Sequence, residues 1–176
     1  ALDTSALHHL LDIYQQEKEW AKAIEIARAL PTSDSHLAQK DIAQFLCELA
    51  TQALAQSRLA DARPLLADAL ATHRKCVRAQ MLLGDTYAAD QQWELAIEQW
   101  QRVEQQNPVY LALIAARLAD AYRKLGRERQ GITLLKSYLE RHTSLDLLDV
   151  VCKEELDTEG PAGALGLVRE ELRRNP

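Results

Sequence analysis

Residues 81–108 read MLLGDTYAADQQWELAIEQWQRVEQQNP, and their pattern of small and large residues returns along the chain. The pair Leu83-Gly84 in this stretch has counterparts, at nearly even spacing, in Leu10-Leu11, Leu49-Ala50, Leu118-Ala119 and Val151-Cys152. Each copy is also marked by one small residue further on, in the series Ala23, Ala62, Ala96, Gly131 and Ala164. This periodicity predicts five repeats, at about 4–36, 37–75, 76–109, 110–143 and 144–176.

The apolar residues of each copy predict two helices. Between residues 42 and 54 they recur at intervals of three and four, which is helical spacing and not strand spacing. The first helices are expected at about 5–17, 37–56, 76–89, 110–125 and 145–157. The second helices are expected at about 20–30, 60–72, 93–106, 128–141 and 162–174.

The breaks between these helices carry turn residues. Pro31-Thr-Ser-Asp makes a longer link and accounts for the wider step between the first two copies, Asn107-Pro108 ends the third pair, and Gly160-Pro161 bends the fifth. A proline deep inside a helix costs about 3 kcal/mol. Pro64 therefore predicts that its helix starts late, with Asp61 as the residue that caps it.

Composition agrees with an all-helical protein. Leu (30) and Ala (27) make up about a third of the 176 residues, whereas β-branched and aromatic residues, which sheets favour, are few. The net charge of −5 argues against nucleic acid as a partner. No run of apolar residues is long enough to cross a bilayer, and the chain begins at Ala1, so we expect a piece of a longer protein without membrane insertion of its own.

Catalysis and metal binding find little support in the sequence. It has no glycine-rich phosphate loop, no nucleophile elbow and no HExxH motif. Cys47, Cys76 and Cys152 form no CxxC pair and favour neither a disulfide framework nor a zinc site, which fits a reducing, cytoplasmic environment. His73 and Cys76 lack the further ligands that structural zinc requires. We therefore expect a protein that is not an enzyme and holds no cofactor.

The repeat resembles the tetratricopeptide repeat, a unit of two antiparallel helices with a period of about 34 residues. Gly84, Ala50 and the small-residue series let paired helices approach closely, and Tyr87, Tyr122 and Trp100 fill the space between pairs. The resemblance implies an all-α, right-handed α-solenoid of about five helix pairs that forms a single domain over residues 1–176.

In such a solenoid the first helices line a concave groove that binds peptides or proteins. By register, we expect this partner-binding groove to present Gln44, Cys47, Thr51, Arg78, Met81, Asp85, Arg117, Asp120, Arg123 and Lys124, with His8, Asp12, Gln15 and Ala116 beside them. Its basic end, Arg117 to Lys124, suits an acidic peptide, and the alternative is a solvated helix face. The carboxylate clamp of chaperone-binding members is not carried over, because Thr51 and Asp85 stand where Asn is required.

A more specific resemblance lies in the first two copies. IYQQEKEWAKAIEIARAL, the long link and IAQFLCELATQAL resemble the LapB (YciM) family of Gram-negative bacteria. The opening RAQMLLGD of the third copy and the residues WQRV at 100–103 agree with it. The CELA run at 47–50 and the length of the link are the specific part of this resemblance.

The LapB resemblance implies a membrane-anchored adaptor on the cytoplasmic face of the inner membrane. Members of that family restrain lipopolysaccharide synthesis by helping the protease FtsH degrade the deacetylase LpxC, and they contact the regulator PbgA (YejM). They also carry an N-terminal transmembrane helix and a C-terminal rubredoxin-like zinc module, and neither pattern occurs in these 176 residues. We therefore expect this chain to be the middle fragment of such a protein, without metal.

Three further readings stay open. Tetratricopeptide arrays precede catalytic domains in some glycosyltransferases, so the chain can also be the accessory region of an enzyme. A generic co-chaperone or assembly factor is a weaker alternative, since the clamp residues are missing. A stack cut from a longer array exposes apolar ends, which favours self-association, including homodimers.

Overall fold

The computed structural model describes residues 3–31 and 35–174, with side chains omitted at 35–37, and this part of the chain contains helices and no strand. The predictions for the link residues 32–34 and for Pro176 lie outside it. Contacts divide the chain into two compact units, residues 1–90 and 91–176. We keep the single domain over 1–176 as a prediction and describe each unit by itself.

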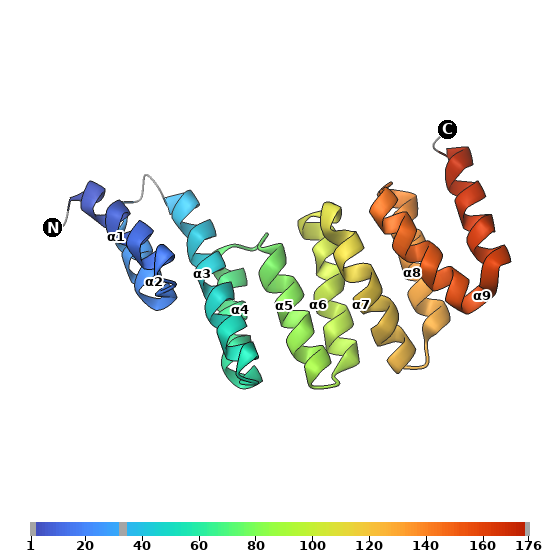
Figure 1. Cartoon of the computed structure of the whole chain (residues 1–176), viewed down its shortest axis with the longest axis horizontal. Coiled ribbons are helices and arrows are strands. Elements are labelled where there is room, and N and C mark those ends of the chain that lie inside the picture. Colours follow the sequence, from blue (N-terminus) through green and yellow to red (C-terminus); the bar gives the residue numbers. More distant parts are fainter. Residues whose placement is uncertain (1–2, 32–34, 175–176) are drawn as a thin grey trace. The chain divides into compact units, whose positions relative to one another are not determined.

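In residues 3–31 and 35–90 the first unit forms five helices. Figure 1 labels them in chain order. They are α1 (Thr4–Gln16), α2 (Trp20–Ala29), α3 (Ser35–Ala55), α4 (Leu59–Thr72) and α5 (Val77–Ala89). Neighbours along the chain pack on one another, and α3 also packs on α5. This contact between the first helices of successive pairs is what a stack of helix hairpins requires.

The second unit contains the remaining helices. They are α6 (Trp93–Gln106), the short 3-10 helix η2 (Pro108–Tyr110), α7 (Leu111–Lys124), α8 (Glu128–Arg141) and α9 (Leu145–Arg174). α7 packs on α6, α8 and α9. In the described part of the chain, no helix is both long and apolar enough to span a membrane.

The helix ends agree closely with those expected from the sequence, and the predicted bend at Gly160-Pro161 is confirmed. Gly160 has φ 74° and ψ −171°, so α9 consists of two helical segments joined at a kink. Pro161 then occupies the first position of the second segment, where its missing N–H leaves no helical bond unmade. The two segments correspond to the two helices expected for the fifth repeat.

The expectation that the helix of Pro64 starts late, with Asp61 as its cap, is wrong. α4 begins at Leu59, with Arg58 and not Asp61 in the capping position, so Pro64 lies inside the helix. Proline removes the hydrogen bond to the carbonyl of Ala60, but both residues are exposed and water can bond to that carbonyl. The early start also buries Ala62, Leu66 and Ala69 completely. The gain from this burial outweighs the lost bond.

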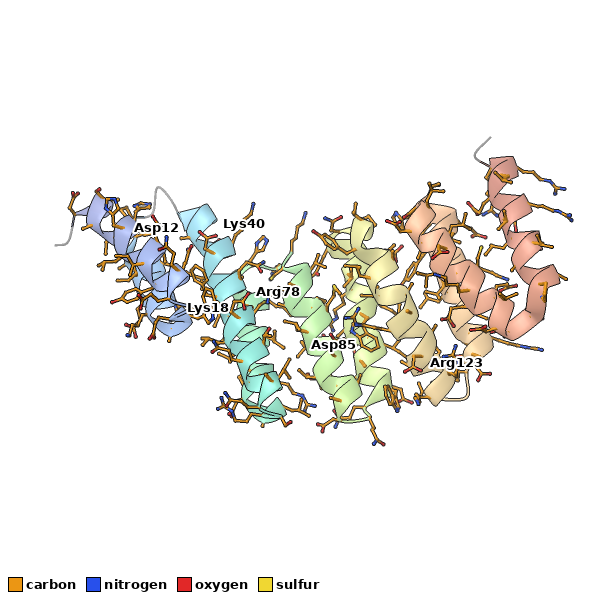
Figure 2. All side chains as sticks on the ribbon, in the orientation of Figure 1. Asp12, Lys18, Lys40, Arg78, Asp85 and Arg123 are labelled. Carbon is orange, nitrogen blue, oxygen red and sulfur yellow. The ribbon has the colours of Figure 1, made fainter. Side chains whose placement is uncertain are left out.

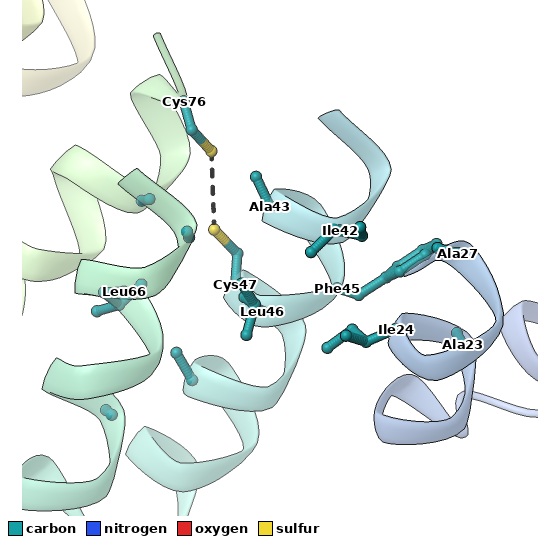
Figure 3. Packing of buried hydrophobic residues seen from close by; sticks show 14 of the residues in the cluster. Ala23, Ile24, Ala27, Ile42, Ala43, Phe45, Leu46, Cys47, Leu66 and Cys76 are labelled. Atoms are coloured by element: carbon teal, nitrogen blue, oxygen red, sulfur yellow. Dashed lines mark hydrogen bonds between the residues drawn. The ribbon is translucent and has the colours of Figure 1, made fainter. Parts of the chain in front are cut away.

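The core of the first unit is built on small residues that face large ones. Ala23, Ala27 and Ala62 are at most 2% exposed, and they share one buried cluster with the larger residues Ile24, Phe45, Leu46 and Leu66. Figure 3 shows Ala23 and Ala27 beside Ile24 and Phe45. Trp20 stacks on Phe45, with ring centroids 5.8 Å apart. Trp20 of α2 therefore packs against α3.

In the second unit, Gly131 is the clearest case of close approach. A Cβ atom added there would lie 2.9 Å from Cβ of Tyr122, so the α7–α8 contact excludes a side chain at this position. The fifth copy differs from expectation, since Ala164 is only half-buried. Gly163 is the closely packed residue instead, and a Cβ there would lie 2.8 Å from Cβ of Glu159. The reason is that the kink holds this residue against the preceding helical segment.

Candidate functional site

In the first unit, the expected partner-binding residues lie on α3 and α5. Arg78 Nη1 donates to Glu48 Oε1 at 2.6 Å, and both side chains remain about a third exposed. This carboxylate raises the pKa of Arg78. Thr51 Oγ1 donates to the carbonyl of Cys47 at 2.8 Å, so it is held against its own helix. Figure 2 labels Arg78 and Asp85 on α5, the helix that also carries Met81.

The expectation that Cys47 lines an open surface is wrong. Its exposed fraction is 0%, and its sulfur lies 3.9 Å from that of Cys76. Viewed down the helix, Cys47 is rotated by about 60° from Gln44, toward the side of α3 that packs on α5. Glu48, which the register did not select, is the neighbouring residue that reaches the surface. Gln44 is exposed and its amide donates to Cys76 Sγ at 3.7 Å.

In the second unit, the expected residues lie on α7 and their charges are partly compensated. Arg123 donates to Glu154 of α9 at 2.7 Å and lies 3.6 Å from Asp120. Arg117 Nη1 donates to the carbonyl of Leu113 on its own helix. Lys124 is exposed in the last turn of α7. An acidic ligand would therefore compete with carboxylates of this chain for Arg123, whereas Lys124 lies open to solvent.

The structure therefore groups the ten expected residues into two sets. Gln44, Cys47 and Thr51 share α3 and lie beside Arg78, Met81 and Asp85 of α5, while the other four share α7. Among the additional residues, His8 is exposed and its Nδ1 lies 2.9 Å from the carbonyl of Thr4. Asp12 and Ala116 are exposed, and Gln15 is half-buried.

Sequence reasoning missed a polar network that joins α4 to α5. The guanidinium of Arg63 donates to Asp90 Oδ2 at 2.5 Å and to the carbonyl of Thr86 at 3.1 Å, and it lies over the ring of Tyr87. No local pattern links residues more than twenty positions apart, so only the fold reveals this network. It fixes the end of α5 and is structural in character.

Sequence reasoning also missed a cavity of about 580 Å³ between α8 and α9. Its lining includes Lys136, whose ammonium donates to Glu155 Oε1 at 2.8 Å. Glu155 is only 4% exposed, and its other carboxylate oxygen has no partner among the described atoms. Glu155 stands at the place that Tyr14, Tyr87 and Tyr122 hold in three of the other repeats.

Metal binding finds no geometric support in residues 3–31 and 35–174. No three side chains among His, Cys, Asp and Glu come together there as a metal site requires. Cys76 approaches Cys47 instead of forming a site with His73. The carboxylate of Glu104 binds basic side chains instead: its Oε1 accepts a hydrogen bond from Arg141 Nε at 2.9 Å and lies 3.0 Å from His142 Nε2.

Comparison with known proteins agrees with this geometry. Tetratricopeptide repeat profiles match residues 47–109 and 117–144. Among solved structures, the crystal structure of MamA superposes with a TM-score of 0.55 at 16% identity, covering 98% of this chain and 95% of that one. A putative kinesin light chain of Podosopora anserina with TPR-like repeats gives 0.51 at 18% identity, covering 97% and 93%. These likenesses show the fold alone.

Two curated proteins are similar in sequence. Lipopolysaccharide assembly protein B of Escherichia coli K12 is 29% identical over 171 residues, which are 97% of this chain and 44% of that protein. Its namesake from Haemophilus influenzae is 35% identical over 123 residues, which are 70% of this chain and 31% of that protein. The chain thus spans less than half the length of these relatives. It is a tetratricopeptide repeat protein with distant similarity to lipopolysaccharide assembly protein B over most of its own length.

Proposed function

We propose that this chain is the repeat region of a non-catalytic adaptor that regulates lipopolysaccharide synthesis. The observation that carries this proposal is the similarity to lipopolysaccharide assembly protein B, which extends over 97% of the chain. Tetratricopeptide repeat proteins are typically binding scaffolds without catalytic activity, and that role agrees with the lack of a catalytic constellation in the described residues. In this role the chain would bring proteins together by its surfaces.

The finer proposal names the partners. The adaptor would hold the deacetylase LpxC for degradation by the protease FtsH, and it would respond to the regulator PbgA (YejM) at the cytoplasmic face of the inner membrane. Support for these partners is the family resemblance carried by the CELA run at 47–50 and the spacing of the first two repeats. This fragment itself would hold no metal and would enter no membrane.

Two surfaces are the proposed docking sites. The first lies on α3 and α5 around the Arg78–Glu48 ion pair, which offers both charges at the surface. The second lies on α7, where Arg117 and Lys124 would bind carboxylates of a partner. On the second surface Arg123 is already paired with Glu154 of α9, so it would hold α7 against α9 more than it would bind a partner.

Affinity capture of the full-length protein from its own cells tests the proposal. Antibodies against LpxC, FtsH and PbgA would identify what is retained, and the half-life of LpxC would be followed after the adaptor is depleted. We expect LpxC and FtsH in the captured fraction and a longer half-life of LpxC on depletion. Absence of both proteins together with an unchanged half-life would refute the regulatory role.

Self-association is a second proposal for the isolated chain. Leu156, Leu165 and Leu172 of α9 are between 47% and 65% exposed. Exposed apolar side chains favour contact with another copy of the isolated chain. Light scattering at several concentrations would measure the fraction of dimer.

A further inference from the structure

Cys47 and Cys76 are brought together by packing and not by sequence. They lie 29 positions apart, on α3 and immediately before α5, yet their sulfur atoms are 3.9 Å apart (Figure 3). Both side chains are buried, with exposed fractions of 0% and 2%. Neither cysteine has a role in the proposed scaffold function, so their contact requires an explanation of its own.

The two thiols are chemically different. Cys76 occupies the N-cap position of α5, where unpaired backbone N–H groups favour a negative charge. Its pKa is lowered to about 6, first by the hydrogen bond from Cys47 and further by backbone N–H groups and the charge of Arg78, against the effect of burial. The same hydrogen bond, together with burial, raises the pKa of Cys47. These opposite shifts favour Cys76 as the sulfur that carries negative charge and Cys47 as the sulfur that keeps its proton.

We propose that Cys47 and Cys76 form a redox modification site that closes to an intramolecular disulfide on reaction with glutathione disulfide. A thiolate next to a protonated thiol is the arrangement in which the first sulfur attacks and the second resolves. The bridge would join α3 covalently to the first turn of α5. It would lie beside the Arg78–Glu48 pair, although its formation does not depend on any partner.

The reaction balances as two thiol–disulfide exchanges. The Cys76 thiolate attacks one sulfur of glutathione disulfide, forms a mixed disulfide and releases one glutathione thiolate. Cys47 then gives its proton to that thiolate, attacks the sulfur of Cys76 and displaces the second glutathione. Two protein sulfurs lose two electrons in total, and one glutathione disulfide becomes two glutathione molecules.

The geometry requires only a short movement. The sulfur atoms must close from 3.9 Å to about 2.05 Å, the length of a disulfide bond. Glutathione must also reach buried sulfurs, which requires residues 73–76, between α4 and α5, to open transiently. A hydrogen bond from the Cys76 N–H to the carbonyl of His73 holds this turn closed.

Cys152 provides an internal control. It is half-buried on α9 in the other unit, and its pKa is raised, first by burial and then by the neighbouring carboxylates of Asp149, Glu155 and Glu171. A protonated thiol reacts slowly with disulfides. Cys152 should therefore remain reduced under conditions that oxidise the pair.

The experiment equilibrates the reduced chain in glutathione buffers of graded oxidising strength, traps free thiols with N-ethylmaleimide and maps disulfides by mass spectrometry. We expect a cross-link between the peptides that contain Cys47 and Cys76, with Cys152 carrying the maleimide. The equilibrium constant for the bridge should be about tenfold or more larger in the folded chain than in urea, because the fold holds the sulfurs together. The Cys152→Ser variant should behave like the parent chain, and Cys47→Ser should trap glutathione on Cys76.

Three results would overturn the proposal. The first is full alkylation of Cys47 and Cys76 at every buffer composition. The second is a bridge that involves Cys152, and the third is an equilibrium constant equal in folded and unfolded chains. The decisive measurement uses the unsubstituted chain, so its outcome does not depend on whether a cysteine variant folds.

Discussion

Five residues in the described part of this chain have a positive backbone φ, which L-residues other than glycine rarely adopt. Lys18, Ser57, Gln91, Gly126 and Gly160 all have φ between 58° and 74°, and each lies in the turn from the first to the second helix of a repeat. Their spacing follows the repeat period, so the turn is part of the repeated unit. Glycine adopts this left-handed conformation freely, whereas other residues lose about 1–2 kcal/mol in it. Three of the five turns therefore store strain.

Replacement of Ser57 by glycine should stabilise the protein. Ser57 is exposed, so little packing is lost, and relief of strain should exceed the entropy that glycine adds to the unfolded chain. We expect a gain of roughly 0.5–1 kcal/mol in the free energy of unfolding, measured by urea denaturation. Gly126→Ala is the matched control, with nothing within 4 Å of the added methyl, and it should lower stability by a similar amount. Equal stability of all three proteins would show that these turns are not strained.

At the scale of helices, the contact between α7 and α8 depends on the absence of a side chain at Gly131. Gly131→Ala would place Cβ 2.9 Å from Cβ of Tyr122, an atom fixed to its backbone. Alanine favours a helix over glycine by about 1 kcal/mol, but forced separation of packed helices costs about 1–3 kcal/mol. We expect a net loss of stability, seen as a lower melting temperature by circular dichroism.

Gly166→Ala is the control for this substitution. Gly166 lies in α9, and nothing lies within 4 Å of a Cβ added there. Only helix propensity should act, and it should raise stability by about 0.5–1 kcal/mol. Opposite signs for the two glycines would separate packing from propensity, while a gain at both would contradict the close approach of α7 and α8.

Glu104 should make the link between α6 and α8 dependent on pH. Burial tends to raise its pKa, but hydrogen bonds and charge from Arg141 and His142 outweigh burial and lower it. A lowered pKa in the folded state means that the carboxylate stabilises the fold above about pH 4.3, its unfolded value. This contribution is lost as the pH falls through the lower, folded value.

Glu104→Gln should therefore cost about 1 kcal/mol at neutral pH and nearly nothing at about pH 2, measured by urea unfolding. Glu98→Gln is the control on the same helix, because Glu98 pairs with Arg102 where both side chains are 54% exposed. Exposed pairs contribute less than about 0.5 kcal/mol, so this control should change stability little at either pH. A constant difference between parent and Glu104→Gln across the pH range would exclude the ionised carboxylate as the cause.

Features of the fold that depend on residues close in sequence can be predicted from the sequence, whereas features that depend on distant contacts cannot. Helix positions and the bend at Gly160-Pro161 depend on residues close in sequence, so both are predictable from local pattern. The start of α4 is not predictable in this way, because it depends on the burial of Ala62 and Leu66 against other helices and not on Pro64 alone. The contact of Cys47 with Cys76 is not predictable from local pattern, because the two residues lie 29 positions apart and only the packing of α3 on α5 brings them together.

For the whole molecule, a repeat protein acts through extended surfaces more than through a pocket. Register alone placed most of the candidate residues on the exposed or half-buried parts of α3, α5 and α7, and burial removed Cys47. The surface that binds an acidic partner should be the one whose positive charge is least compensated by carboxylates of this chain. On α7, Arg123 is paired with Glu154 and Lys124 is exposed, and the proposal for acidic partners depends on Lys124 together with Arg117.

Charge reversal at these two positions tests that dependence. Arg117→Glu with Lys124→Glu should reduce capture of LpxC or FtsH by the full-length protein at least about tenfold, because two attractive contacts become repulsive. Both residues lie outside the fully buried core, so the circular dichroism spectrum and the melting temperature should change little. Lys22→Glu with Arg28→Glu on α2 makes the same change of charge on a second helix, and it should leave capture intact. Equal capture by both double variants would exclude α7 as the docking surface. The Arg78–Glu48 region of α3 and α5 would then be the surface to test. There, Arg78→Glu with Glu48→Arg would preserve the ion pair and reverse its orientation toward a partner.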